Sequence, residues 1–283
     1  MNNPEDLTNR QSDSRPIGVF DSGIGGLTVV RALRDLLPRE KIVYLGDTAR
    51  VPYGSKSAAT VQRYSLEIAD MLMERDAKTI VVACNSASSV ALPKLEEVLT
   101  VPVIGVIRPG AEAAIAATNS GHIGVIGTRA TVRSGAYERH LQDLNSDVEV
   151  TSLACPLLVP LIEEGLLDDP VTDQILRRYL APLLKDGVDT LVLGCTHYPL
   201  LISAIKRVVG PEIQVVDSAR NCATAVQTLL EKENLKASDS GTGALHVSLT
   251  DTPDNFLSVA KEALNLEIGE IEIREVLHKA EAR

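Results

Sequence analysis

One pattern of alternating strands and helices occurs twice in this sequence, and the repetition restricts the chain to folds built from two similar halves. Residues 17–20 (Ile-Gly-Val-Phe) return 106 positions later as residues 123–126 (Ile-Gly-Val-Ile). An apolar strand that ends at Cys84 returns 111 positions later as a strand that ends at Cys195. Because the segments keep their order and their offset grows slowly, we infer a duplicated domain and not chance similarity.

Two further matches lie between these segments. Residues 150–154 match the position that residues 43–47 occupy in the first copy, where a strand is expected. Val159-Pro160 matches Val51-Pro52 at an offset of 108. This period is longer than that of the known solenoid repeats, so the chain is expected to be a doubled domain.

Short apolar runs alternate with amphipathic stretches after Pro16, which is typical of parallel α/β architecture. We expect two similar, pseudo-symmetric lobes, each a mostly parallel sheet flanked by helices, with the active site in the cleft between them. Residues 1–15 are expected to form a disordered tail, residues 16–107 plus 218–283 lobe one, and residues 108–217 lobe two. Residues 102–109 are expected to be a strand that leads out of lobe one.

The composition argues against several classes of function. A formal net charge of −10 over 283 residues disfavours a surface for nucleic-acid backbones. No apolar run approaches the roughly 20 residues of a membrane span. The first residues lack the pattern of a signal peptide. We therefore expect a cytoplasmic protein that contacts neither membrane nor nucleic acid directly.

The four cysteines lie far apart and form no C-x-x-C pair, which argues against structural zinc and against a disulfide framework. Cys155 and Cys222 are expected to be buried small apolar residues. Cys84 and Cys195 differ from them because each ends a strand, where α/β folds usually bind their ligands.

Polar residues follow both of these thiols. Asn85-Ser86 begins a helix directly after Cys84, and the capped helix start is expected to lower the pKa of the thiol from about 8.5. Cys195 has the same setting. His197 adds an imidazole that can hold or relay a proton, although a lone histidine is more often structural. Two thiols on either side of one small molecule suit the transfer of a proton between the faces of a carbon.

Other loops carry candidate ligand-binding residues. Residues 21–26 (Asp-Ser-Gly-Ile-Gly-Gly) do not match the dinucleotide motif G-x-G-x-x-G. Asp21 would repel a phosphate and is better suited to binding an ammonium group or to assisting an acid–base residue. The alternative interpretation of residues 21–26 is a tight turn that contacts no ligand. Residues 46–54 form a loop at the cleft, with or without contact to a ligand. One of Glu163 and Glu164 could serve as a base, although two adjacent glutamates are more often exposed to solvent without a catalytic role.

Four motifs, in this order, resemble those of the glutamate racemases in the aspartate/glutamate racemase family. They are residues 20–28, residues 46–54, residues 84–88 and residues 194–199. The resemblance runs from about residue 17 to the C-terminal strand. It implies an isomerase that interconverts L- and D-glutamate without cofactor or metal and supplies D-glutamate for peptidoglycan, and hence for cell-wall biogenesis and cell shape.

The resemblance also implies roles for particular residues. Cys84 would act on D-glutamate with help from Asp21, and Cys195 on L-glutamate with help from His197 and Glu163. The residues expected to contact substrate are Asp21, Ser22, Pro52, Tyr53, Gly54, Asn85, Ser86, Thr196 and His197. The chemistry agrees, because a thiolate that removes the α-proton on one face and a thiol that returns one on the other invert the centre. One cysteine alone would give exchange without inversion.

Two positions depart from the resemblance. Ser86 stands where threonine is usual, and Arg108 stands where an acidic residue is usual before Pro-Gly. Racemisation of aspartate is a close variant, whereas malonate decarboxylation on related folds needs one cysteine only. The alternative to an enzyme is a two-lobed binding protein whose active site no longer catalyses a reaction, since some family members are associated with inhibition of DNA gyrase. A homodimer is expected from the resemblance.

Overall fold

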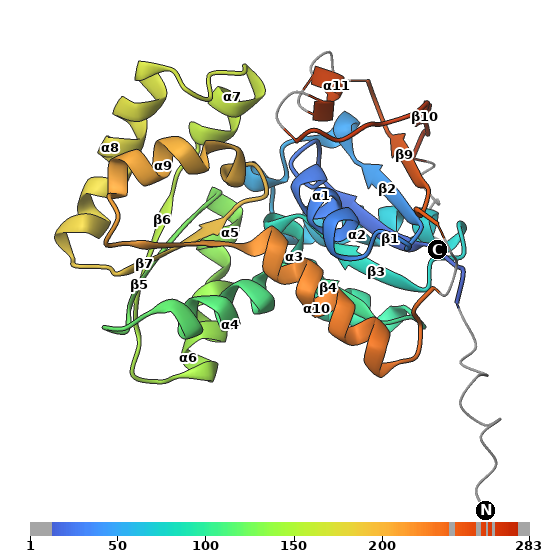
Figure 1. The fold of residues 1–283 in the computed structure, drawn as a ribbon, viewed down its shortest axis with the longest axis horizontal. Helices are drawn as coiled ribbons and strands as arrows, with labels where there is room; N and C mark the ends of the chain where they lie inside the picture. The colour runs from blue at the N-terminus through green and yellow to red at the C-terminus, as the bar shows by residue number, and fades with distance from the viewer. Residues whose placement is uncertain (1–12, 238–240, 253–255, 259, 262–263, 277–283) are drawn as a thin grey trace, which may run out of the picture.

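Two parallel sheets, one of six strands and one of four, form the centre of the computed structural model, which describes residues 13–237, 241–252, 256–258, 260–261 and 264–276 (Figure 1). Every strand pair in both sheets is parallel. Helices lie on both faces of each sheet, so the central strands are buried throughout and largely apolar, whereas edge strands such as residues 149–154 and 271–273 are partly exposed. The α/β fold with two helix-flanked parallel sheets is therefore confirmed.

The first sheet has the strand order β10-β9-β2-β1-β3-β4. Its strands are β1 (Ile17–Asp21), β2 (Ile42–Gly46), β3 (Thr79–Val82), β4 (Val103–Gly105), β9 (Leu245–Leu249) and β10 (Ile271–Ile273). The helical segments that accompany it are α1 (Leu27–Leu36), η2 (Thr48–Arg50), η3 (Tyr53–Ser55), α2 (Ala58–Met73), α3 (Asn85–Val98) and α11 (Phe256–Ser258).

The second sheet has the order β6-β5-β7-β8. Its strands are β5 (His122–Gly127), β6 (Glu149–Ala154), β7 (Thr190–Gly194) and β8 (Gln214–Asp217). Its helical segments are α4 (Ile107–Ala117), α5 (Arg129–Ser134), α6 (Ala136–Leu144), α7 (Leu158–Glu163), α8 (Pro170–Lys185), η4 (Tyr198–Leu201) and α9 (Ile202–Val209). Helix α10 (Ser218–Lys232) returns from β8 toward the first sheet and packs against both α1 and α4 (Figure 1).

The duplication is visible in the topology, because β2-β1-β3-β4 and β6-β5-β7-β8 have the same order. Ile17 lies opposite Ile42, and its counterpart Ile123 lies opposite Val150. The sequence comparison matched Val150 with Val43, which is wrong by one residue. The difference matters because neighbouring residues of a strand face opposite sides of the sheet.

Each sheet buries an apolar cluster on both faces, and the halves again correspond. Val19 belongs to the cluster that includes α1 and α10, and Phe20 to the cluster beneath α2 and α3. Their counterparts Val125 and Ile126 divide in the same way between the two faces of the second sheet. The alternation follows from the two-residue period of a strand.

The predicted strand at residues 102–109 is shorter in the structure. Strand β4 ends at Gly105, and helix α4 begins at Ile107, so Arg108 and Pro109 lie in its first turn. A proline is tolerated there because the first amides of a helix have no partner within the helix. Arg108 is exposed, and its Nε donates to Glu112 at 3.0 Å.

The C-terminal part of the described chain joins the first sheet, since β9 pairs with β2 and β10 pairs with β9. The lobe boundaries near residues 107 and 217 stay a prediction. Residues 1–12 of the expected tail lie outside the described residues. Beyond them, the carbonyl of Asp13 accepts a hydrogen bond from Lys78 at 2.8 Å. None of the described helices has the length and hydrophobicity that a membrane span requires.

Candidate active site

The two cysteine junctions open into one cavity of about 250 Å³. Its lining residues follow β1, β2, β3, β5, β6 and β7, so the cavity lies at the carboxyl ends of strands from both sheets. This is the place where open parallel sheets present loop residues to a ligand. The residues that line it among those predicted are Ser22, Pro52, Tyr53, Gly54, Cys84, Asn85, Ser86, Glu163, Cys195, Thr196 and His197.

Asp21 is the predicted site residue that does not line the cavity. Its carboxylate is fully buried beneath the loop and accepts hydrogen bonds from the amide of Gly23 at 2.8 Å and from the Thr196 hydroxyl at 3.3 Å. Asp21 thus joins the loop after β1 to the residue that follows Cys195. The expected contact of Asp21 with substrate stays a prediction.

Cys84 lies between the end of β3 and the first turn of α3. Its thiol donates to the Ser22 hydroxyl at 3.7 Å. Burial, followed by the negative charge of Asp21, raises the pKa of Cys84 well above its ordinary value, against the amide of Ala87 at the helix start. The helix start acts in the expected direction, but the expected net lowering of this pKa is wrong, because desolvation of the thiolate outweighs the helix amide.

Cys195 has a different partner. Its sulfur lies 3.9 Å from Nδ1 of His197, whose Nε2 lies 3.2 Å from Oε1 of Glu163. Burial lowers the pKa of His197, but the hydrogen bonds to Cys195 and Glu163 outweigh it and raise this pKa to about 10. The imidazole is then protonated at neutral pH. Glu163 is the carboxylate at the cavity, whereas Glu164 is exposed and does not line it.

Glycines let the loop after β1 pack against the second cysteine junction. A Cβ on Gly25 would lie 2.3 Å from Nδ1 of His197 and 2.5 Å from the hydroxyl of Thr196. The hydroxyl of Thr28 also donates to the carbonyl of Thr196 at 3.1 Å. Gly25 therefore serves close packing between the two halves, whereas Gly23 and Gly26 lie against Val51 and Asp21 of their own half.

Behind the loop that carries Tyr53 lies a buried carboxylate, Asp47. It accepts hydrogen bonds from the Tyr53 hydroxyl, from Nε of Arg50 at 2.7 Å and from the Thr250 hydroxyl at 3.0 Å. These bonds anchor the loop, and Gly54 at its tip packs on Thr128, where a Cβ would lie 2.7 Å from the threonine Cβ. The loop predicted at residues 46–54 is thus held against the cavity.

Thr128 and Cys155 are among the residues that line the cavity although the sequence did not single them out as site residues. Thr128 follows β5 as Ser22 follows β1, so the offset of the first strands would have found it. Its hydroxyl lies 2.9 Å from that of Ser86, which joins the two halves across the cavity. Cys155 is buried as expected, and burial raises its pKa to about 12.

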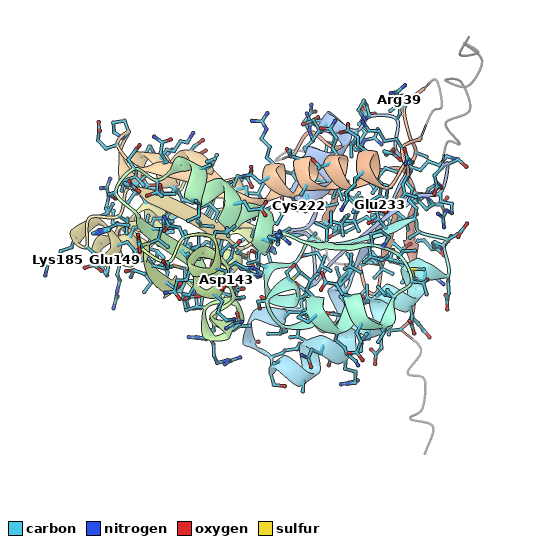
Figure 2. All side chains as sticks on the ribbon, turned by 90° about the horizontal axis from the view of Figure 1, so that it is seen from below. Arg39, Asp143, Glu149, Lys185, Cys222 and Glu233 are labelled. Carbon is cyan, nitrogen blue, oxygen red and sulfur yellow. The ribbon has the colours of Figure 1, made fainter. Side chains whose placement is uncertain are left out.

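The fourth cysteine lies away from this site. Cys222 is on α10 (Figure 2) and packs in the apolar cluster with Ala219 and Val226. This placement agrees with the prediction of a buried small residue. Across the described ranges, no cluster of three or more His, Cys, Asp or Glu side chains is arranged to hold a metal ion.

The fold and the cavity together define a class of protein in which two parallel sheets each contribute a thiol to one cavity. The sequence profile of the Asp/Glu/hydantoin racemase family matches residues 26–226. A glutamate racemase of Geobacter metallireducens is 50% identical over 257 residues, which cover 91% of this chain and 95% of the relative.

Solved structures agree. Glutamate racemase isoform RacE1 from Bacillus anthracis is 40% identical with a TM-score of 0.89, covering 92% of this chain and 97% of that one. The glutamate racemase of Francisella tularensis, solved with D-glutamate, is 36% identical with a TM-score of 0.87, covering 93% and 98%. The chain therefore belongs to the Asp/Glu/hydantoin racemase family. The predicted family and enzyme class, an amino-acid racemase, are confirmed.

Proposed function

We propose that this enzyme interconverts L- and D-glutamate by proton transfer at Cα between Cys84 and Cys195, without a cofactor. The observation that carries the proposal is that both cysteines, at corresponding strand ends of the two sheets, line one cavity. Relatives that align over nearly the whole chain are glutamate racemases, one of them solved with D-glutamate.

In the direction from D to L, the thiolate of Cys84 removes the α-proton of D-glutamate. The thiol of Cys195 delivers its own proton to the opposite face of the planar intermediate, which gives L-glutamate. Cys84 is then neutral and Cys195 is the thiolate, so the enzyme is ready for L-glutamate and the reverse reaction. Protons are conserved, and no electron leaves or enters the site.

The two thiols are assisted by different groups. Ser22 contacts Cys84, and Asp21 lies close enough to affect its ionisation. His197 can hold or relay a proton at Cys195, and Glu163 holds the imidazole in place. A thiol whose pKa is raised is a stronger base once ionised, which helps Cys84 to remove a weakly acidic α-proton.

The substrate brings two carboxylates and an ammonium group, and the cavity offers polar partners for them. We propose that Ser22, Asn85, Ser86 and Thr196 bind substrate, together with the loop of Pro52, Tyr53 and Gly54. Dipoles aimed at the α-carboxylate would stabilise the negative charge that develops when the proton leaves. Exclusion of water from so small a cavity strengthens these interactions.

We further propose that the product serves peptidoglycan synthesis in the cytoplasm and that the enzyme works as a homodimer. Size-exclusion chromatography with light scattering tests the second point, and a mass near twice 30.3 kDa is expected.

The decisive experiment incubates reduced, folded protein with L-glutamate in deuterium oxide and no added cofactor. D-glutamate with deuterium at Cα is expected on a chiral column. No D-glutamate from folded protein with reduced thiols would reject the proposed activity. Aspartate is the comparison substrate, and equal or faster racemisation of aspartate would reject the substrate assignment alone.

A further inference from the structure

Asn85 carries an amide donor that has no partner within the described protein. It is the first residue of α3, directly after Cys84, and its side chain lines the cavity with 2% exposed. Its Oδ1 accepts a hydrogen bond from the Tyr137 hydroxyl at 2.8 Å, whereas Nδ2 has no partner among the described residues. A buried donor without a partner is costly, so Nδ2 is placed for an acceptor that arrives with a ligand.

Tyr137 decides which end of this amide faces the cavity. An amide presents an acceptor and a donor of nearly the same shape, and its orientation follows from its partners. Burial, with a contribution from the charge of Cys195, raises the pKa of Tyr137 far above its ordinary value, so the phenol keeps its proton. The phenolic proton is then donated to Oδ1 of Asn85, and Nδ2 is left toward the cavity.

The ring of Tyr137 also contacts the other thiol junction. Tyr137 lies on α6, beside the second sheet, whereas Asn85 lies on α3, beside the first (Figure 1). A Cβ on Gly194, the residue before Cys195, would lie 3.1 Å from Cε2 of the tyrosine. One buried side chain therefore packs on the residue before one thiol and hydrogen-bonds the residue after the other.

We propose that Tyr137 is a positioning residue that holds the Asn85 amide with Nδ2 directed at the α-carboxylate of the substrate, an assignment that rests on the proposed function. The α-carboxylate is the group in question because Asn85 adjoins Cys84, which reacts at the neighbouring Cα. As the proton leaves, negative charge moves onto the carboxylate oxygens, and the bond from Nδ2 strengthens in the transition state. Tyr137 touches no reacting atom and acts through Asn85.

Tyr137→Phe tests this, since it keeps the ring against Gly194 and removes the hydroxyl alone. We expect kcat and kcat/KM to fall together by roughly 10-fold, with KM nearly unchanged, because the lost interaction belongs to the transition state. An unchanged kcat/KM would overturn the proposal. A rise in KM at constant kcat would overturn the assignment to the α-carboxylate.

A double-mutant cycle separates positioning from a general structural role. Tyr137→Phe is added to Asn85→Ala, and residual turnover is measured by deuterium exchange at Cα. If Tyr137 acts through Asn85, the second substitution costs nothing further. Equal fold losses in both backgrounds would show that Tyr137 acts by another route. Tyr179→Phe on α8, outside the cavity lining, is the matched control and should leave both kinetic constants unchanged.

If Tyr137→Phe fails to fold, Asn85→Asp replaces it, because an aspartate still accepts the hydrogen bond of the Tyr137 hydroxyl but has no Nδ2 donor. Asn85→Asp should lower kcat/KM, because it removes the donor and turns a carboxylate toward the carboxylate of the substrate; an unchanged kcat/KM would overturn the proposal. Wild-type protein assayed in parallel tests the proposed function separately. Normal turnover by both wild type and Tyr137→Phe rejects the positioning role alone.

Discussion

The sulfur of Cys195 lies 3.9 Å from Nδ1 of His197, whereas the residue at the same spacing after Cys84 is Ser86. Two junctions that correspond in the duplicated fold therefore carry different proton partners. The thiol of Cys84 donates to Ser22 instead. The fold is nearly symmetric across the cavity, but the groups that contact the two thiols are not, and the proposed mechanism turns this difference into a measurable asymmetry.

Replacing either thiol of the proposed pair should stop racemisation. We expect Cys84→Ser and Cys195→Ser to lower kcat by about 1,000-fold or more, because a serine hydroxyl is a far weaker acid than a thiol. Cys222→Ser is the matched control, since Cys222 is buried on α10 outside the cavity, and it should keep nearly full activity. Chiral chromatography measures all three. Similar losses in the three variants would refute the assignment.

Weakening the hydrogen-bond partner of Cys195 should change the deuterium isotope effects of the two reaction directions differently. The enantiomers have equal free energies in water, so kcat/KM must stay equal in both directions whatever the variant. The asymmetry is therefore expected in isotope effects. Glu163→Gln should lower kcat/KM by about 10-fold to 100-fold, because His197 loses its carboxylate. The primary effect of α-deuterium should rise for L-glutamate and fall for D-glutamate.

The control for this prediction is Glu164→Gln, since Glu164 is exposed and lies outside the cavity. It should leave rates and isotope effects unchanged. Isotope effects in Glu163→Gln that change equally for both enantiomers would show that Glu163 does not serve Cys195 in particular.

The raised pKa of His197 predicts a pH dependence of stability. The folded-state pKa is about 10, against an ordinary value of 6.5, so the folded protein binds the proton more tightly than the unfolded chain does. The stabilisation from His197 is therefore fully present below about pH 6.5 and is lost as the pH rises through 10. Its loss follows from deprotonation of the imidazole between Cys195 and Glu163.

Urea unfolding of wild type and His197→Asn at pH 6, 8 and 10 measures this contribution. The difference in free energy of unfolding between the two proteins should shrink steadily as the pH rises. Using a difference cancels the titration of other groups. A difference that is constant or grows with pH would contradict a raised pKa for His197.

Close packing between the halves predicts that Gly25 tolerates no side chain. In Gly25→Ala the new Cβ would lie 2.3 Å from Nδ1 of His197, so the imidazole or the loop must move. Misplacement of a catalytic group by about 1 Å costs on the order of 100-fold in rate. Gly269→Ala is the matched control, because a Cβ there meets nothing within 4 Å. Equal activity of both variants would show that His197 can shift without consequence.

Much of the fold could be predicted from local pattern. Apolar runs such as residues 17–20 and 79–83 predicted strands that the structure contains within one or two residues. The transition near Gly105 was harder, because apolar residues continue from the strand into the first turn of α4. Periodicity cannot place a boundary where both elements are buried and apolar.

The residues of the site likewise include some that the sequence predicted and some that it did not. Duplication drew attention to Cys84 and Cys195, and both line the cavity. Tyr137 carried no signal of its own, because its proposed role depends on contacts with residues more than 50 positions away. The same holds for the choice between Glu163 and Glu164, which depends on the turn of a short helix.

By itself, the sequence determined the order of strands and helices, the duplication, and the two thiols at strand ends, because these follow from spacing along the chain. Only the tertiary structure decided that Asp21 lies beneath the cavity lining and that the pKa of Cys84 is raised. Both outcomes depend on which segments exclude water from a group. Desolvation is a property of the packed neighbours on every side, and no local pattern contains it.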